Sequence, residues 1–274
     1  MRIRRLFFVA ATAILLAGCG KDTEDEVSPT PVESEDKELE SNGNSEPTPT
    51  NTPTPEPTAE PTKAAENFLE LYRDDFHMGI ALNPSDFSNW SEIGKTITAN
   101  FDSFTCENEM KPDAVLRQKE SQDGLADGST YKDPVVDFSR SNAAILRALE
   151  NDIKIRFHTL VWHAQTPRWF FTEDYTNEGE YVSREVMLAR MESYIRQVLT
   201  YFDTEYPELI YAVDVVNEAF NGPISDENPH GVVEEVDGHA NYWFDVLGPD
   251  YVYYAFYYAR QYAPDYMKLF YNDY

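Results

Sequence analysis

Several short groups of acidic, amide, imidazole and indole side chains stand out in this sequence, because these side chains can move protons and hold hydroxyl-rich molecules. Each group follows an apolar stretch: Glu107-Asn108-Glu109-Met110-Lys111, Trp162-His163-Ala164-Gln165, Asn217-Glu218 and Asn272-Asp273-Tyr274. Carboxyl groups donate or accept protons, amides bond hydroxyl groups, and an indole ring stacks on a flat apolar face. Any one group alone is equally typical of a solvated loop, so the interpretation depends on whether the fold brings them together.

The apolar stretches before these groups alternate with stretches of helical periodicity. Strands are predicted at 77–83, 100–108, 153–162, 210–220 and 267–273, and helices between them at 86–99, 139–150, 183–203 and 250–263. This alternation predicts an α/β fold of parallel strands joined by crossover helices. In an α/β barrel the ligand site lies at the carboxyl ends of the strands. The polar groups are therefore predicted to converge on one cleft, of the kind that holds a polysaccharide.

The stretch between the second and third strands is harder to interpret. Its polar residues, prolines and glycines predict a long loop over 111–137. Ser139 is a plausible N-cap for the helix that follows, and Ala143, Leu146 and Leu149 lie on one stripe of that helix.

Side-chain parity predicts which residues of the third and fourth strands face the cleft. Because side chains alternate along a strand, His158 and Trp162 share a face and can contact the same sugar, whereas His163 has the opposite parity. The two histidines are therefore poor joint metal ligands, and neither a metal nor a cofactor is expected. A lone buried carboxylate is costly, so we expect Asp214 to contact His163 or another buried donor.

Composition excludes some classes of partner. The formal net charge is −27, from 22 basic and 49 acidic side chains, and such a chain repels the phosphates of nucleic acids. A hydrophobic content of 42% suffices for a core, and with only two cysteines no disulfide framework is possible.

Residues 1–18 resemble a bacterial lipoprotein signal peptide, with a basic start, an apolar stretch at 6–17 that is too short to span a bilayer comfortably, and the sequence Leu16-Ala17-Gly18-Cys19 at its end. The resemblance implies acylation of Cys19 and a secreted protein anchored by lipid to the cell envelope. The alternative is an ordinary cleaved signal with an incidental cysteine. Residues 19–65 are acidic and rich in Pro and Thr, which predicts a disordered linker before a domain at 66–274.

The sequence from residue 66 onward resembles glycoside hydrolase family 10, mostly endo-1,4-beta-xylanases on a (β/α)8 TIM barrel. The resemblance rests on motifs in the right order and spacing: Glu107-Asn108-Glu109-Met110-Lys111-Pro112, His158-Thr159-Leu160-Val161-Trp162-His163, Gln165-Thr166-Pro167, Asp214-Val215-Val216-Asn217-Glu218-Ala219 and Phe270-Tyr271-Asn272-Asp273-Tyr274. It implies retaining hydrolysis of xylan without a cofactor, and a monomer when the barrel is complete.

Residue roles follow from the resemblance motif by motif. Glu218 corresponds to the general acid/base, the proton donor, and Asn217 to the residue that holds the sugar 2-hydroxyl. Other positions correspond to residues that bind the glycone side of the substrate: Glu107, Asn108, Lys111, His158, Trp162 and Gln165. Tyr274 corresponds to a tyrosine near the aglycone side.

The second carboxyl group of the mechanism is not matched. The family nucleophile is a glutamate on strand seven in a Thr-Glu-Leu-Asp-like motif, and no such motif follows Glu218. The sequence stops at Tyr274, where strand five ends, so we expect a fragment of a barrel truncated after about strand five and inactive, or nearly so, on its own. A cell-surface lipoprotein that binds saccharides without cleaving them is the alternative, and a beta-1,4-glucanase is a third interpretation.

Overall fold

The computed structural model describes residues 66–126 and 133–274. The predicted signal peptide, the lipidation site at Cys19 and the linker at 19–65 lie outside the described residues. Within the described ranges, no helix combines the length and the apolar character needed to cross a bilayer.

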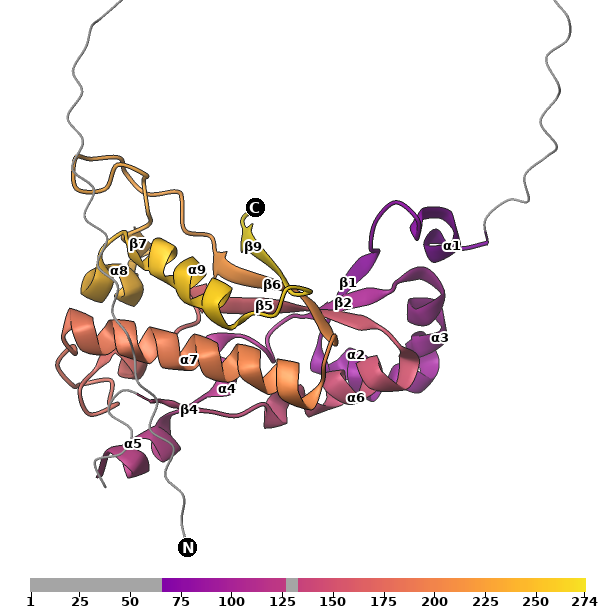
Figure 1. Cartoon of the computed structure of the whole chain (residues 1–274), viewed down its shortest axis with the longest axis horizontal. Coiled ribbons are helices and arrows are strands. Elements are labelled where there is room, and N and C mark those ends of the chain that lie inside the picture. The colour runs from indigo at the N-terminus through magenta and orange to yellow at the C-terminus, as the bar shows by residue number, and fades with distance from the viewer. Residues whose placement is uncertain (1–65, 127–132) are drawn as a thin grey trace, which may run out of the picture. The chain divides into compact units, whose positions relative to one another are not determined.

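A five-stranded parallel sheet forms the centre of the described region (Figure 1). Its strands lie side by side in the order in which they occur along the chain: β1 (Gly79–Leu82), β2 (Ser103–Cys106), β5 (Lys154–Trp162), β6 (Ile210–Asn217) and β9 (Lys268–Asn272). Each neighbouring pair is parallel. The five predicted strands and their parallel arrangement are therefore confirmed, and all their carboxyl ends lie at one edge of the sheet.

Helices connect consecutive strands, and α7 and α6 run along one side of the sheet (Figure 1). The main helices are α2 (Pro84–Ser88), α3 (Trp90–Asn100), α6 (Asn142–Asn151), α7 (Arg184–Glu205), α8 (Tyr242–Leu247) and α9 (Tyr251–Tyr262), and a short α1 (Phe68–Tyr72) precedes β1. Ser183 caps α7, where its hydroxyl accepts the backbone N–H of Val186. The apolar stripe of α7, including Met187, Met191 and Val198, is fully buried.

The region predicted as a polar loop at 111–137 contains regular structure instead. It folds into α4 (Pro112–Val115), α5 (Gln118–Ala126) and a small antiparallel pair of β3 (Leu116–Arg117) with β4 (Val135–Val136). The loop prediction was wrong because a few apolar residues within the polar sequence, Val115 and Leu116 among them, are buried in the core.

The start and the buried face of α6 also differ from the prediction. Ser139 lies in a 3-10 turn, its hydroxyl bonds Asp137, and α6 begins at Asn142. The buried face of α6 consists of Ala144, Ile145 and Ala148. Leu146 and Leu149, on the expected stripe, are 57% and 49% exposed.

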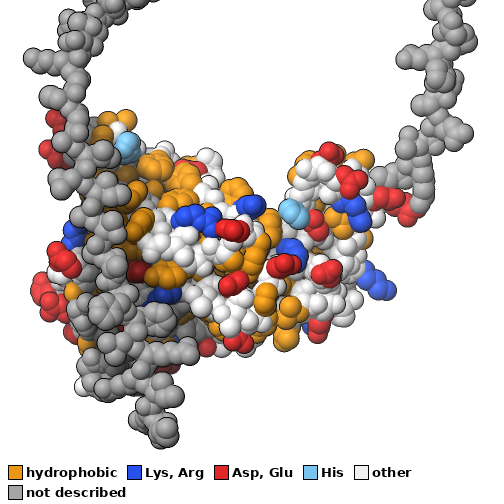
Figure 2. Space-filling view, viewed as in Figure 1, with side chains coloured by type: hydrophobic (Ala, Val, Ile, Leu, Met, Phe, Trp, Pro, Cys, Tyr) orange, Lys and Arg blue, Asp and Glu red, His pale blue; other side chains and the backbone are white. Residues whose placement is uncertain are grey.

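The two faces of the sheet differ in chemistry. One face is apolar and buried against the helices, through residues such as Phe104, Ile155, Phe157 and Val213. The other face borders a hollow of about 500 Å³ lined largely by polar side chains, among them His77, Ser103, Glu107, Arg156, His158, Asp214 and Asn272. Apolar side chains also reach the surface over α9 and beside β9 (Figure 2), where Tyr253, Tyr257 and Phe270 are 64%, 49% and 41% exposed.

Candidate active site

A hydrogen bond joins the ends of the two central strands. Trp162 is the last residue of β5 and is paired with Asn217, the last residue of β6. Glu218 directly follows Asn217. The indole Nε1–H of Trp162 donates to Oε2 of Glu218 at 2.9 Å. Glu218 is half-buried and has a left-handed backbone with φ of 52°, which turns the chain out of the strand. The carboxyl group is thereby held at the carboxyl edge of the sheet.

A buried lysine lies on the other side of the same indole. The ammonium of Lys111 is 4.7 Å from the centroid of the Trp162 ring and donates to Oε1 of Gln165 at 2.8 Å and to Oδ1 of Asn108 at 3.2 Å. Burial lowers the pKa of Lys111, and the nearby carboxyl groups oppose that effect: Asp113, Glu218, Glu107 and Glu109. This cation ties the polar groups after β2 and β5 together; we call Asn108, Lys111, Trp162 and Gln165 the lysine cluster.

A second network lies deeper along the sheet. Nδ1 of His158 is 3.0 Å from Oδ2 of Asp214, which is 2% exposed, and Nε of Arg156 bonds both oxygens of that carboxylate at 3.0 and 3.1 Å. Because the carboxylate can only accept, Nδ1 carries the proton and Nε2 of His158 remains to bond a ligand. The prediction that Asp214 contacts another buried donor is confirmed for His158, while His163 is not its partner.

The register of the strands explains this choice, because His158 lies directly opposite Asp214 in the pairing of β5 with β6, whereas His163 follows the last residue of β5. Beyond this pair, irregularities interrupt β5 between His158 and Val161, and β6 between Asp214 and Val216. Nδ1 of His163 is buried and has no hydrogen-bond partner among the described residues. His158 and Trp162 still lie close, with ring centroids 6.4 Å apart, as expected of residues on one side of the cleft.

Asn217 is held by the neighbouring strand. It is 2% exposed, and its Oδ1 accepts the Nδ2–H of Asn272 at 2.7 Å. The side-chain oxygen is thus occupied within the protein, which leaves the amide N–H groups of Asn217 as donors to a ligand hydroxyl.

The structure therefore brings together most of the residues that the sequence analysis selected. Glu107 is exposed and lines the same hollow as His158. Tyr274 lies apart from the lysine cluster: it is 88% exposed, and its hydroxyl accepts the side-chain N–H of Asn221 at 2.6 Å. Sequence reasoning gave no role to Asn272 or Tyr271, although both stand in the strand-end motif.

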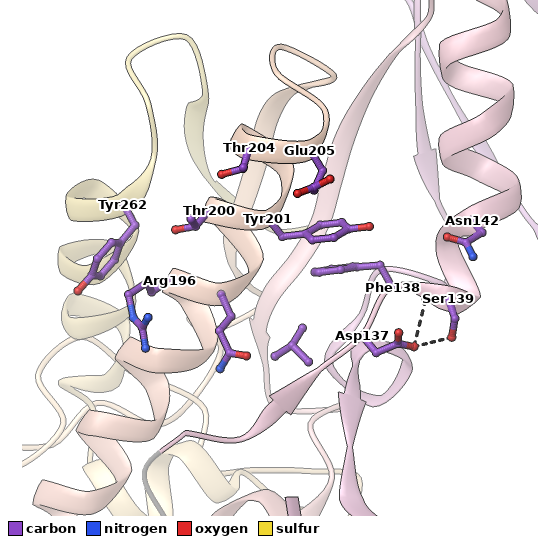
Figure 3. A pocket seen from close by; sticks show the side chains of 12 residues that line it. Asp137, Phe138, Ser139, Asn142, Arg196, Thr200, Tyr201, Thr204, Glu205 and Tyr262 are labelled. Atoms are coloured by element: carbon purple, nitrogen blue, oxygen red, sulfur yellow. Dashed lines mark hydrogen bonds between the residues drawn. The ribbon is translucent and has the colours of Figure 1, made fainter. Parts of the chain in front are cut away.

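A second hollow, of about 650 Å³, lies on the outside of the molecule between α7, Tyr262 of α9 and the residues around Phe138 (Figure 3). Phe138 and Tyr201 stack with centroids 4.4 Å apart and separate Asp137 from Glu205. Asp137 is already paired with Arg117. This hollow is a weaker candidate for catalysis, because the carboxyl groups of Asp137 and Glu205 do not face each other and the hollow is remote from the carboxyl ends of the strands.

A parallel βα sheet with acids, amides, a lysine and an indole gathered at the strand carboxyl ends defines the class of α/β-barrel proteins that bind their ligands at that edge. The family model of glycosyl hydrolase family 10 matches residues 67–274. The chain belongs to this family, whose fold is a (β/α)8 TIM barrel, and β1, β2, β5, β6 and β9 are five consecutive strands of it.

Curated relatives are xylanases by name. The chain is 40% identical over 210 residues to endo-1,4-beta-xylanase Y of Acetivibrio thermocellus, which covers 75% of this chain and 19% of the relative. It is 38% identical over 215 residues to endo-1,4-beta-xylanase A of Thermotoga maritima, covering 78% and 18%. The chain thus spans less than a third of the length of these relatives.

Solved structures agree with the fold. The CBM22-1–GH10 modules of endo-1,4-beta-D-xylanase 10B from Clostridium thermocellum, complexed with xylohexaose, match with a TM-score of 0.63 and 40% identity over 72% of this chain and 38% of that chain. An intracellular xylanase from Thermoanaerobacterium saccharolyticum matches with a TM-score of 0.58 and 28% identity over 77% and 57%.

Proposed function

We propose that this chain carries the proton donor and the glycone-binding residues of an endo-1,4-beta-xylanase. The observation that carries the proposal is the hydrogen bond of Glu218 with Trp162, a member of the lysine cluster, in a chain of glycosyl hydrolase family 10. It places one half-buried carboxyl group next to the donors that a sugar ring needs. The xylohexaose bound to the similar clostridial structure supports the choice of substrate.

The proposed reaction is retaining hydrolysis of xylan. Glu218 donates a proton to the glycosidic oxygen while a second carboxylate attacks the anomeric carbon, which breaks the bond to the leaving sugar. Glu218 then takes a proton from water, and the resulting nucleophile releases the bound sugar with its configuration retained. Proton transfer of this kind contributes roughly 10²–10⁴-fold to the rate.

The remaining residues hold the substrate in this proposal. Asn217 donates to the 2-hydroxyl of the reacting sugar, and His158 through Nε2 and the lysine cluster bond the glycone hydroxyl groups. Glu107 accepts from a hydroxyl group at the same side, and Tyr274 contacts the aglycone. Held by Asp214, whose carboxylate is itself bonded by Arg156, the His158 ring needs no reorganisation on binding.

The second carboxylate is not assigned within the residues that the structure describes. The second candidate function is that of a saccharide-binding protein without turnover. These functions are separated by offering xylan and cello-oligosaccharides to the complete natural protein and to the 274-residue chain. Turnover of xylan supports the xylanase, and turnover of cello-oligosaccharides supports a glucanase. Binding without turnover supports the second candidate.

Residues 1–18 and Cys19 support a further part of the proposal, an acylated N-terminus that anchors the protein to the cell envelope. Two or more acyl chains give stable anchoring, since each buried methylene contributes about 0.8 kcal/mol. Incorporation of labelled fatty acid, lost in Cys19→Ser, is expected. Equal labelling of the variant would contradict the anchor.

The direct test of the proposed function is Glu218→Gln in the complete natural protein. Glutamine keeps the size of the side chain and removes the proton, so hydrolysis of xylan should fall by about 10²–10⁴-fold while xylohexaose is still bound. An active Glu218→Gln variant would overturn the proposal.

A further inference from the structure

The backbone at Glu218 has a conformation that its own sequence does not favour. A φ of 52° in a residue that is not glycine is uncommon, and such residues persist only where their surroundings hold them. The turn begins directly after Asn217 and aims the Glu218 carboxyl group at Nε1 of Trp162. What holds this turn therefore determines where the carboxyl group lies.

The end of β9 supplies the contacts that hold the turn. The N–H of Glu218 donates to the backbone oxygen of Asn272 at 2.9 Å. The next two N–H groups, of Ala219 and Phe220, both donate to the hydroxyl oxygen of Tyr271, at 3.0 and 3.2 Å. Three successive N–H groups of the turn thus bond to one neighbouring strand.

The Tyr271 hydroxyl is itself oriented by a second side chain. It donates its proton to the carboxylate of Asp273, so its one proton and both lone pairs are in use. Burial, reinforced by the bond to Asp273, raises the pKa of Tyr271 to about 12, so the hydroxyl keeps its proton throughout the neutral range. The Tyr271 ring also packs on Phe220, with centroids 5.0 Å apart. We call Tyr271 and Asp273 the tyrosine clamp.

We propose that the tyrosine clamp positions Glu218: Tyr271, oriented by Asp273, fixes the backbone after Glu218 and so keeps its carboxyl group against Trp162. The inference rests on the proposed function for its catalytic consequence, while the positional relationship is independent of activity. Neither clamp residue is proposed to touch the sugar.

The positional relationship is tested on the 274-residue chain by following the indole N–H signals of its four tryptophans by NMR. Trp162→Phe identifies the signal of Trp162. In the unchanged chain this signal should lie downfield, because the indole N–H donates a hydrogen bond to the Glu218 carboxyl group. In Tyr271→Phe, two backbone N–H groups lose their acceptor, and the Trp162 signal should move upfield. Tyr253→Phe, an exposed tyrosine of α9, is the matched control and should leave the signal unchanged.

A purely structural role for Tyr271 predicts a different result: lower stability with the Trp162 signal intact. A folded Tyr271→Phe chain whose Trp162 signal keeps its position would overturn the inference. If Tyr271→Phe does not fold, Asp273→Asn and Asp273→Ala replace it. Asparagine still accepts from Tyr271 and should preserve the signal, whereas alanine leaves the hydroxyl unoriented and should shift it; an unchanged signal in both would equally overturn the inference.

The catalytic consequence is measured in the complete natural protein. Tyr271→Phe should lower kcat on xylohexaose by roughly 10–100-fold with little change in KM, because a displaced catalytic group costs rate rather than ground-state binding. If the unchanged protein hydrolyses xylan and Tyr271→Phe matches it, the inference alone fails. If the unchanged protein has no glycosidase activity, the proposed function fails, and the NMR result still decides the positional relationship.

Discussion

The indole N–H of Trp162 lies 2.9 Å from a carboxylate oxygen of Glu218, and the ammonium of Lys111 lies 4.7 Å from the centroid of the same indole. One side chain therefore contacts both the proposed proton donor and the cation of the lysine cluster. Since indole can donate but not accept a hydrogen bond, it fixes one carboxylate oxygen and leaves the other for the glycosidic oxygen.

Removing the indole N–H while keeping an aromatic ring should impair catalysis. A hydrogen bond to a charged group contributes about 1.5–3 kcal/mol, so Trp162→Phe should lower kcat/KM on xylohexaose by roughly 10–100-fold. The smaller ring also weakens the contact with Lys111, so KM should rise. Steady-state kinetics in the complete natural protein measure both effects, and unchanged kinetics would show that the contact has no role.

Replacing the buried Lys111 should weaken the binding of substrate without lowering the stability of the fold. Lys111→Met removes the bonds to Gln165 and Asn108 and should weaken xylohexaose binding by about 10-fold or more, since hydrogen bonds to charged groups contribute about 1.5–3 kcal/mol. Lys111 is only 9% exposed, so its cation is partly desolvated, which also lowers its pKa. The apolar variant should therefore unfold at the same or a higher urea concentration. Calorimetry and urea unfolding test the two halves, and unaltered binding would contradict the role of the lysine cluster.

The carboxylate of Asp214 should contribute strongly to stability. Asp214→Asn leaves Arg156 and His158 without their charged acceptor, and breaking a buried pair costs about 3–5 kcal/mol, reduced here because Arg156 is 33% exposed. The matched control is Asp123→Asn, which breaks the exposed pair with Lys119 and should leave the free energy of unfolding nearly unchanged. Equal effects of the two substitutions in urea unfolding would contradict this account.

We expect the chain to lose stability as the pH decreases, in part because of His163. Burial lowers the pKa of His163 below 6.5, and the nearby Glu218 only partly opposes the effect. Just below pH 6.5, His163 therefore binds a proton in the unfolded chain but not in the folded chain. The stability that the neutral side chain contributes is fully present above pH 6.5 and is lost progressively as the pH falls below it. His163→Gln should reduce the loss of stability between pH 7.5 and 5, measured by urea unfolding. His239→Gln, at an exposed histidine, is the control and should not reduce this loss of stability. If His163→Gln and the unchanged chain show the same pH dependence, the assignment to His163 is wrong.

Much of the fold follows from local sequence, because the strands are strongly apolar and Ser183 is a typical helix cap. The buried face of α6 does not, since Ala144 and Ala148 pack where Leu146 and Leu149 were the more apolar choices. The partner of Asp214 could not be predicted, because it depends on the pairing of β5 with β6, which sets His158 directly opposite Asp214 and is not visible in the sequence of either strand.

The candidate site was predictable to the extent that its residues stand at strand ends. The lysine cluster and Glu218 converge because parallel strands end at one edge. The role of Tyr271 was not visible, because its hydroxyl bonds backbone N–H groups about fifty positions away along the chain, and such contacts leave no pattern in the sequence.

The most direct test of the account replaces Glu218 in the complete natural protein and compares substrates that differ in their need for a proton. Glu218→Ala should lower kcat/KM on xylohexaose by about 10²–10⁴-fold. The loss of kcat/KM should be much smaller on an aryl xylobioside, because its leaving group departs as a stable anion and needs no proton. Added azide, which attacks without a general base, should restore turnover and yield a glycosyl azide. The control Glu227→Gln, at an exposed residue of the loop after β6, should retain full activity. Equal losses on both substrates without azide rescue, or undiminished activity on xylohexaose, would contradict the assignment of Glu218 as proton donor.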